Sequence, residues 1–243
     1  MCVVSFALLP PRAPETPVVV EVPHAGLRLD PEAMGYLCAP VHALARDADL
    51  YVDELMADAP LEGATLLVAH VSRYVCDLNR SPDDADAASV AGGLAPPNPH
   101  GLIWNRTTAG QPALLGGPVP VAEYERRLST YYKPYHRALE EVLRRKREKF
   151  GFSVLLCAHS MPSRPLVVAE AGRADLVPGT RGRTTCANSL VTVLEDLVAL
   201  QGWSLRHDDP YRGGYTTALH GRPKEGSHAL QIELARRLYL DET

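Results

Sequence analysis

Two histidines of this chain each follow an apolar stretch that is typical of a buried strand. His24 follows residues 18–23, and His159 follows residues 152–158. Fully apolar strands are expected in parallel sheets with both faces covered, and ligands bind at the carboxyl ends of such strands. Because parallel strands end at the same edge of a sheet, we expect His24 and His159 to lie close together and to bind one metal ion.

Acidic residues of the segment 47–54 could complete this metal site. Catalytic zinc usually binds three side chains, drawn from histidines and carboxylates, and leaves one position for water. The segment offers three aspartates, Asp47, Asp49 and Asp53. Bound zinc lowers the pKa of its water toward about 7 and polarises a carbonyl group. We therefore predict a site for one Zn²⁺ ion, with other divalent metals as alternatives, and a carboxylate of this segment as its third ligand.

A further carboxylate near the metal could act as a general base. Glu233 lies at the end of the last predicted strand, residues 228–234. A carboxylate in this position could take a proton from water and pass it to a leaving amine. The predicted chemistry is therefore the hydrolysis of an amide bond.

Arginines could anchor the substrate. Arg80, preceded by Asn79, follows the second apolar strand, residues 64–70. The planar guanidinium group of arginine can hold a carboxylate with two hydrogen bonds. Arg73 and the cation of a Gly-rich turn, Arg212, are further candidates. The sequence thus favours a small substrate that carries a carboxylate.

Ser160 directly follows His159, and a serine hydrolase is therefore the main competing interpretation. Adjacent residues rarely face one another, and the chain has no G-x-S-x-G motif. A P-loop, a G-x-G-x-x-G after a strand and an H-E-x-x-H are also absent from the sequence. We therefore predict Ser160 to contact substrate rather than to act as a nucleophile.

The pattern of elements predicts an α/β fold with a single domain over residues 1–243. Segment 81–120 contains seven prolines and six glycines without clear periodicity, and we expect it to be a long ordered loop that covers the active site. Beyond the strands above, the predicted elements are a helix over 31–44, a short helix near 50–56, a helix over 121–150 that Pro134 kinks or splits, a helix capped by Thr185 or Asn188 that ends near Leu200, and an edge strand at 203–206.

Composition excludes several classes of protein. A net charge of -4 and a pI of about 6.1 give no reason to expect binding to nucleic acid or to an anionic membrane. No apolar run approaches the roughly 18 residues of a membrane span, and the first ten residues lack the pattern of a signal peptide. Five widely spaced cysteines without C-x-x-C argue against a disulfide framework. The expected location is the cytoplasm.

Taken together, these motifs resemble the N-formylglutamate amidohydrolase family. The resemblance covers nearly the whole chain, and it rests on Pro23-His24-Ala25-Gly26, Asp47-Ala48-Asp49, Ser72-Arg73-Tyr74-Val75, Asp77-Leu78-Asn79-Arg80, Pro134-Tyr135-His136, Ala158-His159-Ser160, Gly213-Gly214-Tyr215 and residues 228–233. It implies a three-layer α/β/α sandwich with a central mixed, mostly parallel sheet, one zinc ion, and hydrolysis of an N-acyl amino acid such as N-formyl-L-glutamate. It also favours Asp47 or Asp49 over Asp53 as the metal ligand.

The motifs are similar to those of zinc carboxypeptidases and aspartoacylases as well. In those enzymes an Asn-Arg pair binds the substrate carboxylate and a late glutamate is the general base, which correspond here to Asn79, Arg80 and Glu233.

Three positions depart from the family pattern. Cys157 replaces an aspartate that often precedes Ala-His-Ser, and Ala218 and Leu219 replace a cation and a histidine. We expect Cys157 to pack as a small apolar side chain. The changes at 218 and 219 leave a different acyl group or amino acid open. The alternatives are a zinc carboxypeptidase or amidase that acts on a peptide or cell-wall fragment, and a degenerate member that binds a ligand without catalysis; the sequence does not predict an oligomeric state.

Overall fold

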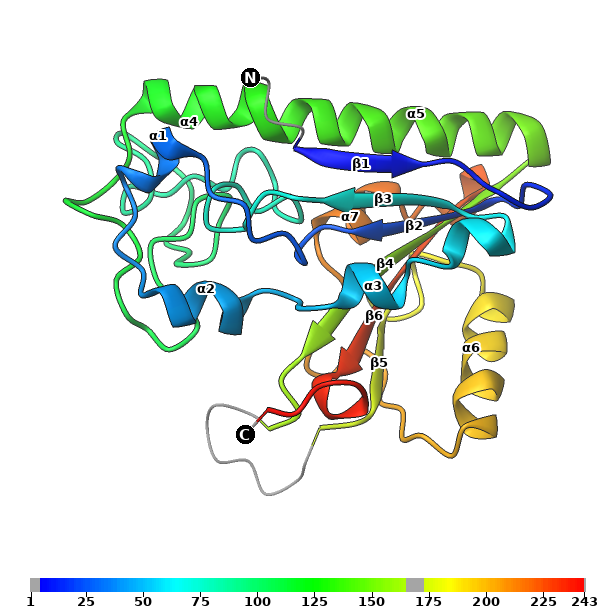
Figure 1. The fold of residues 1–243 in the computed structure, drawn as a ribbon. Helices are drawn as coiled ribbons and strands as arrows, with labels where there is room; N and C mark the ends of the chain where they lie inside the picture. Colours follow the sequence, from blue (N-terminus) through cyan, green and yellow to red (C-terminus); the bar gives the residue numbers. More distant parts are fainter. Residues whose placement is uncertain (1–4, 165–172, 243) are drawn as a thin grey trace. The chain divides into compact units, whose positions relative to one another are not determined.

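The computed structural model describes residues 5–164 and 173–242 (Figure 1). Its internal contacts divide the chain into two compact units. Unit 1 comprises Met1–Leu9, Val22–Glu54 and Leu67–Glu141, and unit 2 comprises Pro10–Glu21, Leu55–Leu66 and Val142–Thr243. Each unit is therefore built from segments that are distant in the sequence.

The fold belongs to the α/β class, as predicted, with a mixed six-stranded sheet and flanking helices. The strand order is β1-β3-β2-β4-β6-β5. β2 is parallel to β4, β4 is parallel to β6, and the edge strand β5 is antiparallel to β6. The strands are β1 (Phe6–Leu9), β2 (Val18–Val22), β3 (Thr65–Ala69), β4 (Ser153–Met161), β5 (Leu176–Gly179) and β6 (Ser227–Ala235).

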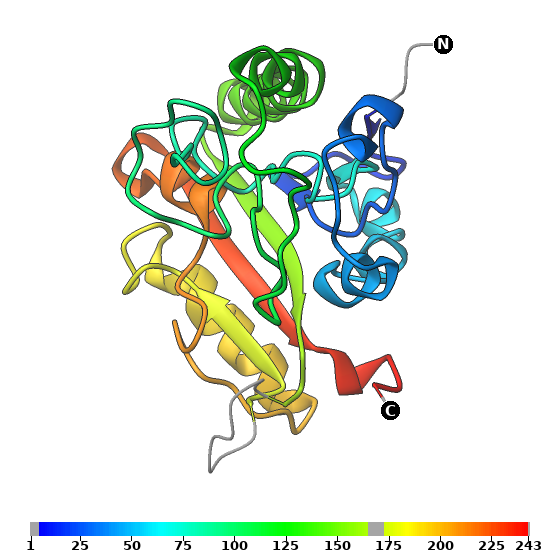
Figure 2. The same cartoon turned by 90° about the vertical axis from the view of Figure 1, so that its left-hand side faces the viewer.

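One face of the sheet in unit 2 is covered by helix α6 (Asn188–Leu200), which runs alongside β5 (Figures 1 and 2). The helix buries Val191 and Val198 against apolar side chains of β4, β5 and β6. Because side chains alternate along a strand, this face takes every second residue, including Val154 of β4 and the even-numbered residues Leu230 and Ile232 of β6. Their burial is the apolar contribution that holds α6 to the sheet.

The opposite face of the same strands carries polar side chains. Helix α7 (Tyr215–His220) packs against β4 and β6, and its buried Thr216 and Thr217 contact the sulfur of Cys157. In the register of β4 and β6, Cys157 lies opposite Gln231, and His159 lies opposite Glu233. Polar residues of two neighbouring strands are thus brought side by side.

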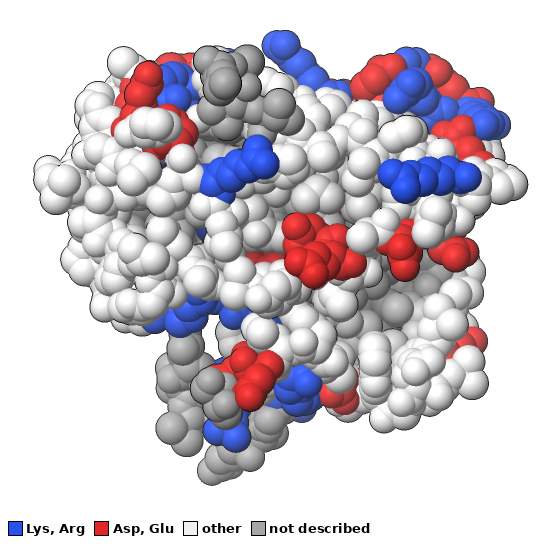
Figure 3. Space-filling view, in the orientation of Figure 1, with Lys and Arg blue, Asp and Glu red and all other residues white. Residues whose placement is uncertain are grey.

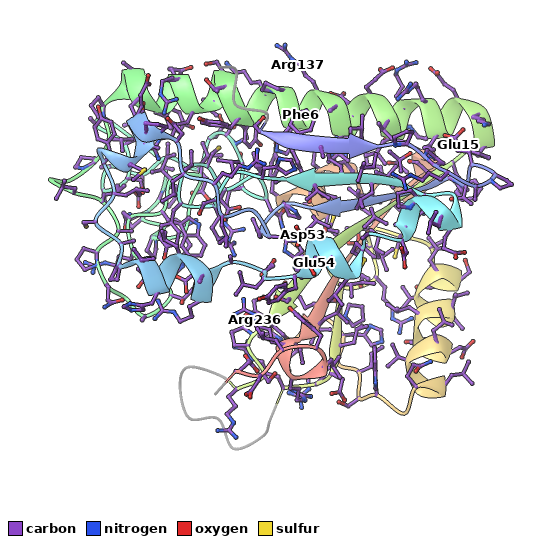
Figure 4. The ribbon with its side chains drawn as sticks, viewed as in Figure 1. Phe6, Glu15, Asp53, Glu54, Arg137 and Arg236 are labelled. Atoms are coloured by element: carbon purple, nitrogen blue, oxygen red, sulfur yellow. The ribbon has the colours of Figure 1, made fainter. Side chains whose placement is uncertain are left out.

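The long helical segment after residue 120 is continuous. It consists of α4 (Val121–Arg127), a π-helical stretch η2 (Leu128–Tyr132) and α5 (Lys133–Phe150). No break occurs at Pro134, because the helix passes from η2 directly into α5 at Lys133. A π-helical stretch inside a helix is a recognised local adjustment of its hydrogen bonding. In unit 1, Tyr135 of α5 packs edge-on against Phe6 of β1. Phe6 is labelled in Figure 4.

Several predicted boundaries were wrong. The helix expected over 31–44 is two helices, α1 (Pro31–Met34) and α2 (Val41–Asp47), because Pro40 disfavours the helical conformation of the residue before it. The expected short helix is α3 (Val52–Leu55). Helix α6 has Ala187 at its N-cap without a side-chain hydrogen bond, so neither predicted residue caps it.

The expected edge strand at 203–206 is a single bridge between Leu205 and Leu176. The strands β1 and β5 were not predicted. Segment 81–120 is irregular, as predicted, with isolated bridges only.

The surface carries charges of both signs, and the described cysteines form no disulfide bonds. Acidic and basic side chains are interspersed over the face shown in Figure 3. The four cysteines of the described residues, Cys38, Cys76, Cys157 and Cys186, are free. Among residues 5–164 and 173–242, no helix has the length and apolar character that crossing a membrane requires.

Candidate metal and catalytic site

His24 lies two residues beyond the end of β2 and is 2% exposed. The turn that follows it is held tightly in unit 1, because a Cβ atom on Gly26 would lie 2.4 Å from the backbone carbon of His70. Only glycine fits at such a distance. The Ala25-Gly26 pair therefore fixes the backbone beyond His24 against the end of β3.

Asp49 is the carboxylate that this turn brings to His24. Its backbone N–H donates to the carbonyl of His24 at 3.0 Å, and its Oδ2 lies 3.7 Å from His24 Nδ1. Both side chains are buried. The two atoms face one another at a separation that suits two ligands of one ion.

The other ring nitrogen of His24 is bound by Asp77. The distance from His24 Nε2 to Asp77 Oδ1 is 2.7 Å. Because a carboxylate accepts, this contact places the proton on Nε2 and leaves Nδ1 as the lone-pair nitrogen that faces Asp49. Carboxylates in this position orient metal-binding histidines and raise their basicity.

Asp77 is itself held by several further donors. Its Oδ1 accepts from the backbone N–H of Asn79 at 2.9 Å, and its Oδ2 accepts from Trp104 Nε1 at 3.0 Å and from Arg73 Nη2 at 3.0 Å. Burial alone would raise the pKa of Asp77, but its interaction with His24 and the charges of Arg73 and Arg80 outweigh it and hold this pKa well below its usual range. Asp77 is therefore a buried, ionised carboxylate.

No role for Asp77 is predicted from the sequence, although Asp77 belongs to the Asp-Leu-Asn-Arg motif. One signal could have indicated a role for Asp77: it begins the motif whose Asn79 and Arg80 are predicted to bind substrate. Its partner His24 is 53 positions away, and spacing along the chain does not reveal such a contact.

His159 and Glu233 lie on neighbouring parallel strands in unit 2. They are register partners of β4 and β6, so their side chains leave the same face of the sheet. Both are buried, with exposures of 3% and 5%. Gln231, two residues earlier on β6, donates its Nε2 to Glu233 Oε1 at 2.8 Å.

His24, Asp49 and His159 form a group that could hold a metal ion. Each offers one ligand atom, and these atoms all lie within 4.8 Å of one another. Glu21 of β2 is the register partner of Cys157 of β4, so the two strands end at the same edge of the sheet. Two imidazoles and one carboxylate are a donor set that suits a catalytic Zn²⁺.

Asp47, the other candidate ligand, is engaged elsewhere. Its Oδ1 accepts from Arg46 Nε at 2.9 Å and from the hydroxyl of Thr108, and its Oδ2 accepts from the hydroxyl of Tyr74 and the backbone N–H of Thr108. Burial would raise its pKa, but the hydrogen bonds from Arg46, Thr108 and Tyr74 lower it. The geometry therefore favours Asp49 as the ligand. Asp53 lies on α3 (Figure 4).

The predicted substrate-binding residues fall into different surroundings. Arg80 donates from Nε to the carbonyl of His100 at 2.7 Å and from Nη1 to the carbonyl of Asn79 at 2.9 Å. Arg73 lies over the ring of Trp104 and pairs with Asp77, so it supports the surroundings of His24.

In unit 2, Arg212 is exposed in its turn. Ser160 leaves the face of β4 opposite to that of His159, and its hydroxyl accepts from Nε of Arg236, which follows β6 (Figure 4).

Segment 81–120 is built into the surroundings of His24 in unit 1. Trp104 donates to Asp77, and Thr108 donates to Asp47. This loop is therefore anchored in unit 1 by hydrogen bonds to two buried carboxylates.

Cys157 is buried and hydrogen-bonded. Its sulfur lies 3.3 Å from the hydroxyl of Thr216 and 3.5 Å from that of Thr217. Burial and the nearby Glu21 raise the pKa of Cys157 well above its ordinary value. A neutral thiol is a poor metal ligand, and this agrees with the expectation that Cys157 packs.

Comparisons with known proteins give one family. The model of the family described as N-formylglutamate amidohydrolase matches residues 16–240. The chain is 35% identical over 228 residues to N-formylglutamate deformylase of Pseudomonas aeruginosa, and 34% identical over 229 residues to that of Pseudomonas putida; each match covers 93% of this chain and 83% of the relative. A crystal structure of N-formylglutamate amidohydrolase from Ralstonia eutropha JMP134 superposes with a TM-score of 0.91 at 34% identity, covering 99% of this chain and 89% of that one.

Proposed function

Because the chain belongs to the N-formylglutamate amidohydrolase family, we propose that it hydrolyses the amide bond of a small N-acyl amino acid, with N-formyl-L-glutamate as the first candidate. The observation that carries this proposal is the buried group of His24, Asp49 and His159. A zinc ion bound there would lower the pKa of a water molecule and polarise the carbonyl of the amide.

In this proposal, Glu233 moves the proton. Its carboxylate takes a proton from the attacking water as the new C–O bond forms, and it gives that proton to the nitrogen as the C–N bond breaks. For N-formyl-L-glutamate the products are formate and glutamate. The register of Glu233 with His159 supports this assignment, because the two side chains leave the same face of the sheet at paired positions of neighbouring strands.

The remaining residues bind and orient. Asp77 keeps the Nδ1 lone pair of His24 available for the metal. Arg80, with Asn79, would bind the carboxylate of the substrate through the guanidinium group. Arg212 is a second candidate for this contact because it is exposed in its turn. The free cysteines of the described residues favour a reducing compartment, and we place the reaction in the cytoplasm.

The test is hydrolysis of a panel of N-acyl amino acids by the purified protein, with zinc and after removal of metal by a chelator. We expect cleavage of N-formyl-L-glutamate that chelation abolishes and zinc restores. Ala218 and Leu219 make other acyl groups and amino acids necessary members of the panel. Absence of cleavage of every member, with zinc present, would refute the proposal.

Glu233→Gln tests the assignment of the base. The amide keeps the shape of the side chain but cannot accept a proton, so kcat should fall by about 10²–10⁴-fold. Zinc binding should be retained, because Glu233 lies outside the group of ligand residues. An unchanged kcat would remove Glu233 from the mechanism.

A further inference from the structure

Gln231 is a buried amide that contacts two partners of unit 2. It is 4% exposed on β6, and it shares a face of that strand with Glu233 because the two positions are two residues apart. Its Oε1 accepts from the backbone N–H of Gly214 at 2.7 Å. Its Nε2 donates to Glu233 Oε1 at 2.8 Å.

The contact with Gly214 fixes the orientation of the amide. A backbone N–H can only donate, so the oxygen of Gln231 must face it. The NH₂ group then faces Glu233, whose Oε1 must accept. Oε1 of Glu233 is therefore held in a defined place by a neutral donor.

Gly214 is held in turn by close backbone packing. It is the N-cap of α7, and it follows Gly213, which has a φ of 97°. A Cβ atom on Gly179 of β5 would lie 2.5 Å from the nitrogen of Gly213. The turn that presents the Gly214 N–H is thus seated directly on the edge strand of the sheet.

We propose that Gln231 is a positioning residue that orients the carboxylate of Glu233 for proton transfer. The inference rests on the proposed role of Glu233 as general base. The backbone N–H of Gly214 fixes the amide of Gln231. The NH₂ group of that amide then holds Oε1 of Glu233. Gln231 itself acts only through Glu233.

Two variants separate the two hydrogen bonds of Gln231. Gln231→Met has a similar length and loses both contacts. Gln231→Glu keeps an acceptor for Gly214 but replaces the donor to Glu233 by an oxygen. We expect each to lower kcat by about 10–100-fold, with KM within about threefold of wild type, because orientation of the base is needed in the transition state rather than for substrate binding.

A double variant tests whether the effect passes through Glu233. In Gln231→Met/Glu233→Gln, kcat should lie within about threefold of that of Glu233→Gln alone, because residues that act as a unit are not additive. Thr217→Val is the matched control: it removes a buried hydrogen bond to Cys157 on the same face and should leave kcat within about twofold. Zinc affinity should be unchanged in all of these variants.

The inference is overturned if Gln231→Met keeps wild-type kcat, or if its effect multiplies with that of Glu233→Gln. It is also overturned if Thr217→Val lowers kcat as much as Gln231→Met, since loss of any buried contact would then suffice. If Glu233→Gln retains kcat, the assignment of the base and this inference both fail while the hydrolase activity stands. A wild-type protein that cleaves no substrate refutes the proposed function and this inference together.

Discussion

Replacing Asp77 by asparagine removes the carboxylate that contacts Nε2 of His24. The amide has nearly the same shape but offers an NH₂ group in place of one oxygen. In the native protein, Oδ1 faces His24 Nε2, and Oδ2 faces donors from Trp104 and Arg73. Whichever way the amide turns, its NH₂ group meets a group that donates. If it faces His24, the ring must move its proton to Nδ1, the nitrogen that faces Asp49.

This geometry predicts that the substitution lowers both the stability of the protein and its affinity for zinc. Removing one partner of a buried ion pair costs about 3–5 kcal/mol, and we expect the lower figure because the Arg73 side chain keeps 12% of its exposure. Loss of the carboxylate behind a metal-binding histidine weakens metal affinity by about 10–100-fold. The free energy of unfolding should therefore fall by about 3 kcal/mol, and the Kd for zinc should rise by one to two orders of magnitude.

Asp47→Asn is the matched control. Asp47 is also a buried aspartate with several donors, but its carboxylate accepts from Arg46, Tyr74 and Thr108. It should lose stability while its Kd for zinc stays within about twofold of wild type. Zinc affinity is measured by competition with a chelating dye, and stability by urea unfolding of the same samples. A folded Asp77→Asn protein with wild-type zinc affinity, or equal weakening in both variants, would refute the reasoning.

Two further substitutions test the packing of unit 2. Glu15→Gln should lower the free energy of unfolding by about 1 kcal/mol at neutral pH, because the buried Lys146 loses its carboxylate partner. The hydrogen bonds of Lys149 and Lys146 lower the pKa of Glu15 from 4.5 to about 2, so this difference should persist above pH 4.5 and shrink as the pH falls toward 2, in urea unfolding of both proteins. Gly179→Ala should cost about 1–3 kcal/mol, because its Cβ would lie 2.5 Å from the nitrogen of Gly213; an unchanged melting temperature would contradict this.

The parts of the site that the sequence predicts are those set by local pattern. The apolar runs before His24 and His159 predicted the buried strands β2 and β4, and the strand that carries Glu233 was predicted as well, although β4 and β6 continue beyond His159 and Glu233. The edge strands were missed because β1 and β5 have four residues each. Such short runs carry too little alternation to distinguish them from loops.

Contacts between distant loops could not be predicted in this way. Asp47 and Asp49 look equivalent in the sequence, since both are aspartates just before the short helix predicted near 50–56. What separates them is the hydrogen-bonding of Asp47 to Tyr74 and Thr108, and Thr108 belongs to a segment without periodicity. The choice of ligand thus depends on how an irregular loop closes, which residue types alone do not determine.

Ser160 shows how much depends on a small error in a boundary. The sequence places the end of the strand at residue 158, and a serine beyond a strand end could turn toward the metal. In the structure β4 continues to Met161, so the alternation of side chains continues through His159 and Ser160. Three additional residues of strand therefore send Ser160 to the face of Arg236 and keep His159 with Glu233. Since hydrogen bonds to β6 carry the strand through these positions, it is the pairing partner, absent from any local pattern, that decides which of two adjacent polar residues can take part in the chemistry.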